Sequence, residues 1–137
     1  MEKYNLLEAD IERLYRFAED NKDTYANAEP FSHTAIEDFV YPHILEGVLE
    51  ELESNQEGEK WNKMDDRYQN KWSCSSTLRM GVKTRNLIQY LNSQEMLTLL
   101  EKLTGIDGLV SYAYLAGGGL HELRDGGYLG VHADFNY

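Results

Sequence analysis

The residues best suited to chemistry are an imidazole and a carboxylate near the end of the chain, His132 and Asp134. They lie two positions apart on a segment with the composition of a β-strand. A strand turns alternate side chains to opposite faces, so both groups project from one face while Leu129, Val131 and Ala133 project from the other. We expect the first face to hold a metal ion and the second to pack in a core.

The spacing of this pair is typical of one kind of metal site. One imidazole and one carboxylate, completed by a second imidazole, make the ligand set that leaves positions open on non-haem Fe(II). The bare spacing is a weak signal, because an exposed histidine beside a solvated acid fits it as well. The glycines Gly126, Gly127 and Gly130 allow close backbone approach around the pair. The metal interpretation therefore depends on the surrounding sequence.

The surrounding sequence carries a longer pattern. Gly117–Leu123 (GGGLHEL) is followed by Gly126–Leu129 (GGYL) and then by His132–Asn136 (HADFN). This pattern resembles the metal-binding segment of the 2-oxoglutarate and Fe(II)-dependent oxygenases, in the prolyl 4-hydroxylase-like branch. Three upstream segments are also similar to parts of such proteins: His33–Val40, Leu91–Ser93 and Leu100–Ile106. The likeness covers most of the chain and is sharp from about residue 90 onward.

The resemblance implies a fold and a reaction. The fold is a double-stranded β-helix, a jelly-roll related to the cupins, with helices packed on one side. The reaction uses Fe(II), 2-oxoglutarate and O2, with ascorbate as a further requirement, and hydroxylates a prolyl or other peptide side chain, or a small molecule. His132 and Asp134 are the implied iron ligands. His121 and Tyr128 are implied to bind the cosubstrate, His121 because one predicted hairpin brings it near His132, and Tyr128 because it shares a face with His132.

The chain departs from the family pattern after the aspartate. A second histidine and a cationic residue that binds the keto acid are expected well beyond Asp134, yet only Phe135, Asn136 and Tyr137 follow. We expect a fragment of a longer oxygenase, with a separate chain for the missing strands or a decayed reading frame as alternatives. An unpaired sheet edge would then be open to another chain. Two other functions stay open: a non-catalytic binding module that keeps the fold, and a cupin-type metal protein of other chemistry.

Composition narrows the class of partner. The 137 residues carry a net charge of −11, which disfavours nucleic acid and anionic membranes. The single cysteine, Cys74, forms no internal disulfide, and no apolar run approaches the roughly 18 residues of a membrane span. We expect a cytoplasmic protein that acts on a peptide or small molecule.

The elements that must position the site are predicted to be α+β. Residues 1–137 form a single domain, in which 1–104 are mainly helical support with an early strand and 105–137 begin the β-helix core with the metal motif. Apolar spacing predicts helices over about residues 5–20, Pro42–Ser54, Lys83–Tyr90 and Asn92–Leu103. A capping box at Asn92 and Glu95 opens the last helix, and Gly105 ends it.

Strands are expected mostly in the second half of the chain. Composition and alternation predict strands over Phe31–Val40, Leu109–Leu115, Leu120–Arg124 and the segment from Tyr128. Asp125–Gly127 is the hairpin turn between the last two, and Tyr112 and Tyr114 belong to the core. The polar stretch 54–72, with Trp61 and Trp72, is expected to form a loop.

The missing ligands lead to a testable expectation. We predict that the purified chain releases no succinate from 2-oxoglutarate with iron and ascorbate, because two protein ligands hold Fe(II) poorly. Iron-dependent turnover by the 137-residue chain would overturn this expectation.

Overall fold

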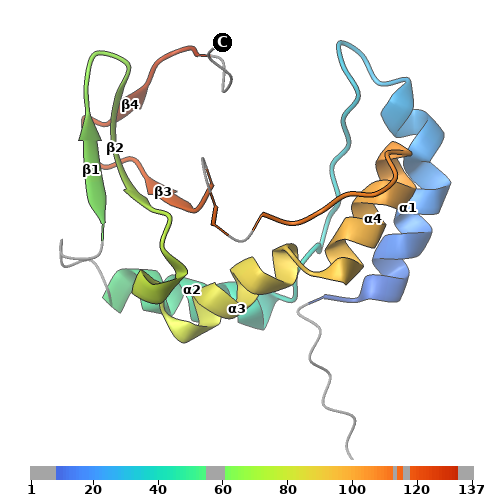
Figure 1. Cartoon of the computed structure of the whole chain (residues 1–137), viewed down its shortest axis with the longest axis horizontal. Helices are drawn as coiled ribbons and strands as arrows, with labels where there is room; N and C mark the ends of the chain where they lie inside the picture. The colour runs from blue at the N-terminus through green and yellow to red at the C-terminus, as the bar shows by residue number, and fades with distance from the viewer. Residues whose placement is uncertain (1–8, 55–60, 113, 116–117, 133–137) are drawn as a thin grey trace, which may run out of the picture.

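The computed structural model describes residues 9–54, 61–112, 114–115 and 118–132 (Figure 1). Within these residues the chain is α+β, as predicted. Its helices are α1 (Ile11–Ala26), α2 (Pro42–Ser54), the short 3₁₀ helix η1 (Thr77–Arg79), α3 (Val82–Leu91) and α4 (Gln94–Thr104). Its strands are β1 (Asn62–Asp65), β2 (Gln69–Cys74), β3 (Leu120–Glu122) and β4 (Tyr128–Leu129).

The main core lies between the first and last helices, which pack side by side in Figure 1. Leu14 and Ala18 face inward from α1, and Leu99 and Leu103 from α4. Leu14 is 0% exposed and Leu99 is 1% exposed. Full burial of one such leucine contributes about 1.5–3 kcal/mol. This helix pair is therefore the most strongly packed part of the described chain.

Helix α1 differs in its bounds from the predicted helix at 5–20. It begins at Ile11, where the side chain of Asp10 accepts a hydrogen bond from the backbone N–H of Arg13 (3.0 Å). It continues to Ala26, because the polar residues after position 20 lie on its exposed side while Tyr25 packs against the core. Positions 5–8 of the prediction lie outside the described residues.

The predicted strand Phe31–Val40 is wrong, because this segment is irregular. The guanidinium of Arg13 donates to the backbone carbonyls of Glu37 (3.3 Å) and Asp38. Ile36 and Phe39 pack against the core between α1 and α4. A cation from α1 thus satisfies carbonyls that a strand would have offered to a neighbouring strand.

The second helix pair consists of α2, whose bounds match the prediction, and α3. Glu51 of α2 caps the N-terminus of α3, accepting hydrogen bonds from the backbone N–H groups of Lys83 and Thr84 (both 2.8 Å) and from Thr84 Oγ1 (2.9 Å). A Cβ at Gly81 would lie 2.2 Å from Glu51 Oε2, so this approach requires glycine. One carboxylate therefore joins two helices and replaces a local cap.

The boundary between α3 and α4 lies one residue later than predicted. Ser93, not Asn92, is the N-cap of α4, and its side chain accepts from Met96 N (3.4 Å). Asn92 instead ends α3, where its side-chain amide donates to the carbonyl of Ile88 (2.9 Å). The prediction for Gly105 is confirmed, since this residue ends α4 with φ of 72°.

The first two strands form a hairpin inside the stretch that was expected to be a loop. Asn62 pairs with Ser73 and Asp65 with Asn70. The turn is held by Asp66, whose Oδ1 accepts from the backbone N–H groups of Tyr68 (2.7 Å) and Gln69 (3.1 Å). Half of the sheet therefore comes from the region that was expected to be mainly helical.

The last two strands do not form the predicted hairpin with each other. Both pair antiparallel with β2: Glu122 lies opposite Trp72, and Tyr128 lies opposite Asn70. They follow one another along one side of β2, and the intervening residues 123–127 loop out (Figure 1). The predicted turn exists within this loop, where Gly127 N donates to Arg124 O (2.7 Å). The prediction that β3 and β4 pair with each other was wrong because β2, the strand with which both pair, was not predicted.

The predicted strand Leu109–Leu115 is absent from the sheet, and position 113 lies outside the described residues. The expected core position of its tyrosines is also wrong, because Tyr112 and Tyr114 are 59% and 82% exposed. No helix in the described part of the chain is both long enough and apolar enough to cross a membrane.

Replacement of Glu51 by alanine is expected to destabilise the fold by about 1–2 kcal/mol, because the first turn of α3 loses its cap. Glu50→Ala is the matched control, since within the described residues the neighbouring Glu50 makes an exposed ion pair with Lys83 (2.9 Å) and no other polar contact. Urea unfolding measures both variants. Equal losses of stability in the two would contradict the capping role.

This stabilisation should also depend on pH. Burial raises the pKa of the Glu51 carboxyl, but hydrogen bonds from Thr84 and Lys83 outweigh it and lower the pKa below its ordinary value of 4.5. The contribution of Glu51 is therefore complete above the ordinary value and is lost as the pH falls through the lowered one. The difference in stability between the parent chain and Glu51→Ala should shrink in acid; a constant difference would argue against the charge.

Candidate functional site

The backbone of Gly130 positions the predicted metal ligand His132. The N–H of Gly130 donates to the carbonyl of Tyr68 (2.6 Å), which extends the contact with the β1–β2 hairpin one residue past β4. Its own carbonyl lies 2.8 Å from Nδ1 of His132. A Cβ at Gly130 would lie 3.1 Å from the Tyr68 carbonyl oxygen, so the approach is tight. One glycine thus connects the imidazole to the sheet.

The contact with a carbonyl orients the ring of His132. Because a carbonyl oxygen only accepts, Nδ1 is the donor in this contact. Imidazoles that coordinate a metal are commonly oriented by such a hydrogen bond from the ring nitrogen that does not bind the metal. The His132 side chain is exposed. Its chemistry and accessibility fit a metal ligand.

The strand that leads to this site is shorter than predicted. It ends at Leu129, so His132 does not lie on a strand. The expected apolar core behind the ligands is also wrong for Leu129, which is 47% exposed, and for Val131, which is fully exposed. The face opposite the proposed ligands is exposed because no described element covers this end of the sheet. Asp134 and Ala133 lie outside the described residues. Among the residues that the structure describes, no group of three histidine, cysteine, aspartate or glutamate side chains could hold a metal ion.

His121 lies at the other end of β2 from the segment that carries His132. His121, on β3, pairs with Ser73 of β2, whereas Gly130 contacts Tyr68. Five strand residues at about 3.3 Å each place these positions roughly 17 Å apart along the strand. The structure therefore does not bring His121 and His132 together, because the expected proximity required the hairpin that does not form.

The surroundings of His121 are built from the other half of the chain. His121 lines a cavity of about 280 Å³ with five other residues: Leu49, Leu52, Glu53, Trp61 and Glu122. Burial, and then the charge of Lys71, hold the pKa of the His121 imidazole below its ordinary value of 6.5. The imidazole is therefore neutral near pH 7. A neutral ring beside two glutamates is poorly suited to bind a dicarboxylate.

Tyr128, the other predicted cosubstrate residue, contacts the β1–β2 turn. Its hydroxyl donates to the carbonyl of Asp66, so its proton is engaged within the sheet. The residue is 43% exposed and pairs with Asn70. In this structure it ties β4 to the hairpin.

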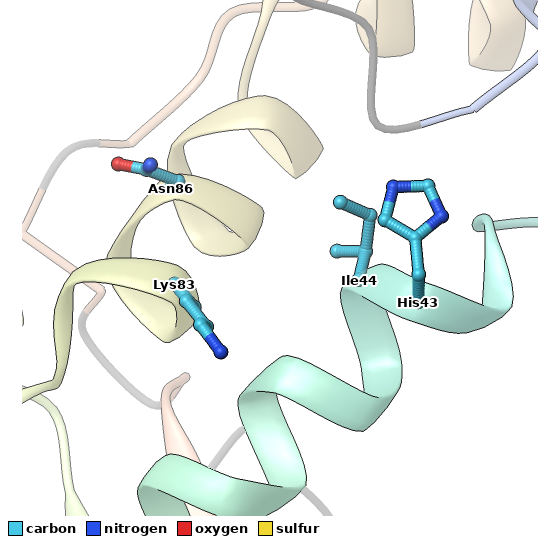
Figure 2. Close-up of a pocket in the computed structure, with 4 residues that line it drawn as sticks. All are labelled: His43, Ile44, Lys83 and Asn86. Atoms are coloured by element: carbon cyan, nitrogen blue, oxygen red, sulfur yellow. The ribbon is translucent and has the colours of Figure 1, made fainter.

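A second cavity, of about 310 Å³, lies between α2 and α3 and is lined by His43, Ile44, Lys83 and Asn86 (Figure 2). Its polar groups do not converge. In Figure 2 the Asn86 amide points away from His43. The Lys83 ammonium pairs with Glu50 (2.9 Å), and the His43 ring stacks on Tyr41 at 5.8 Å. This cavity does not present a set of groups that act on one ligand.

Sequence reasoning missed the residues around His121. The stretch that was expected to be a loop contains Trp61 and Lys71, and the helix Pro42–Ser54 contains Glu53. Their meeting depends on the β2–β3 pairing, which joins positions about fifty residues apart. The only local signal was the presence of a tryptophan in an otherwise polar stretch.

Replacement of Lys71 by methionine should raise the pKa of His121 toward its ordinary value, because a nearby positive charge is removed. The pKa should stay below that value, since burial is the larger cause. Lys63→Met is the control, because Lys63 pairs with Asp65 (2.7 Å) and lies opposite Trp72, on the other face of the sheet from Lys71. NMR titration of the imidazole measures both. An unchanged pKa in Lys71→Met would contradict this account.

Comparison with known proteins assigns no identity to the chain: no protein-family model, curated protein or solved structure matches it. The evidence on function is therefore the chemistry of the residues themselves. Of the two candidate regions, the segment after β4 has a histidine whose Nδ1 donates to a backbone carbonyl, and the cavity at His121 has a neutral histidine among acids and apolar groups.

Proposed function

We propose that this chain is part of an Fe(II)- and 2-oxoglutarate-dependent dioxygenase in which His132 and Asp134 are two of the metal ligands. The observation that supports the proposal is the position of His132 three residues beyond the end of β4, with Nδ1 donating to the Gly130 carbonyl at 2.8 Å. In the proposed site Nε2 would be the coordinating nitrogen. Asp134, two residues further on, supplies the carboxylate of the ligand set.

The proposed fold for this function is a double-stranded β-helix of which the present sheet is a part. The antiparallel pairing of β1, β2, β3 and β4 is compatible with such a sheet, and β1 has no strand on its outer side within the described residues. Further strands could pair with the open edge of β1. The helices would then support one side of the β-helix.

The chain's own residues would hold and orient the reacting groups. When bound, Fe(II) with 2-oxoglutarate and O2 supplies the oxidation that converts a substrate C–H bond into an alcohol. The Gly130 carbonyl orients the His132 ring, and Tyr128 anchors the strand that leads to it. Ascorbate would serve to keep the iron reduced. The substrate class is a prolyl or other side chain of a peptide, or a small molecule.

Mn(II) is a suitable probe for the proposed ligands, because it prefers oxygen and nitrogen donors and broadens nearby NMR signals. Addition of Mn(II) should broaden the signals of Gly130 and His132 first. His132→Ala or Asp134→Asn should weaken this binding by roughly tenfold, which corresponds to about 1.4 kcal/mol for one lost ligand.

His33→Ala is the matched control for this experiment. The His33 ring makes the same contact with the carbonyl two residues earlier, Nδ1 to Phe31 O at 2.8 Å, but Ala35 stands where the second site has an aspartate. The control should leave the broadening at Gly130 unchanged. Equal broadening around His33 and His132, or no effect of Asp134→Asn, would rule out a two-residue site.

A further inference from the structure

The cavity at His121 is a separate site from the proposed metal ligands. It lies between α2 and β3, at the Cys74 end of β2, whereas His132 follows the segment that contacts Tyr68 beyond the other end. Its volume of about 280 Å³ is just below the roughly 300 Å³ at which sites for drug-sized ligands begin. A cavity of this size suits one side chain or a small organic ion.

Part of the cavity wall is apolar and open to solvent. Leu49 is 55% exposed, although its spacing on α2 predicts a buried position. Leu52 and the half-buried Trp61 line the same cavity. Apolar side chains gathered in one hollow provide a surface for the aliphatic part of a ligand. The indole adds an aromatic face of the kind that attracts cations.

The polar part of the wall is acidic. Glu53 is exposed, and no residue within the described ranges donates a hydrogen bond to its carboxylate or pairs with it. Glu122 accepts from Arg124 through both oxygens, at 3.1 Å each. His121 adds no positive charge near pH 7, because its pKa is lowered. Of these lining groups, Glu53 is therefore the one with a charge left to attract a cation, and it acts against the charge of Lys71, which reaches His121 from outside the lining residues.

We infer that this cavity binds an alkylammonium group, with its carbon chain against Leu49, Leu52 and Trp61 and its charge beside Glu53. Two sources share this chemistry: the side chain of a lysine in a peptide, and a free amine. The inference does not depend on the proposed metal site, since no metal ligand lines the cavity. A dicarboxylate such as 2-oxoglutarate is disfavoured here by the charge of Glu53.

The test is an NMR titration of the 137-residue chain without metal, observed at the Trp61 indole and the His121 ring. The probes are a blocked Gly-Lys-Gly peptide, butylammonium, a blocked Gly-norleucine-Gly peptide and 2-oxoglutarate. We expect saturable shifts with the first two probes and a dissociation constant on the order of 1 mM, as befits one side chain. Tighter binding of the lysine peptide than of butylammonium assigns the site to peptides, and equal binding assigns it to free amines; both support the inference.

Glu53→Gln should weaken the binding of either cation about two- to fivefold, the range for one exposed ion pair. Glu46→Gln is the control, because Glu46 is an exposed acid on the same helix that does not line the cavity. Equal binding of the norleucine peptide, saturable binding of 2-oxoglutarate in place of the cations, or the same effect from both glutamate variants would overturn the inference. Because no metal is present and the signals lie at the other end of β2, failure here is distinct from failure of the Mn(II) experiment.

Discussion

Antiparallel pairing along a single strand, β2, is the constraint on which the arrangement of both candidate sites depends. β1 pairs with one side of β2, and β3 and β4 share the other side. All four residues of β1 are exposed, whereas Lys71 and Cys74 of β2 are buried. The register along β2 therefore decides that His121 lies near α2 and that His132 leaves the sheet at the opposite end.

The helices could be predicted well because their signals are local. Pro42 and the apolar spacing after it define α2 to the residue, and Gly105 ends α4 with the expected left-handed backbone. The strands could not be predicted as well, because pairing joins distant segments. The Phe31–Val40 segment has strand-like composition, but Arg13 takes up its carbonyls. The polar β1 offers no apolar alternation, although the turn at Asp66 was a usable signal.

In the candidate site, too, contacts between residues close in sequence differ from contacts that depend on strand pairing. The sequence pattern predicted His132 on a strand, but that strand ends at Leu129, and the orientation of the His132 ring comes from its contact with the Gly130 carbonyl. The relation of His121 to that strand did not follow from short-range sequence, because it depends on β3 and β4 lying in line along β2 and not side by side. The acids and apolar groups around His121 come from α2 and from the residue before β1, which no local pattern connects to β3.

The loop formed by residues 123–127 can change in length without changing how β3 and β4 pair with β2. Both flanking strands are registered independently on β2, and residues 123–126 of the loop are exposed, so its contour length does not set either register. Insertions at this turn can be absorbed at a small entropic cost while the two ends of β2 keep their neighbours. The loop is therefore a natural point at which related chains can vary in size, and a place to graft a spectroscopic label between the two sites without displacing either one.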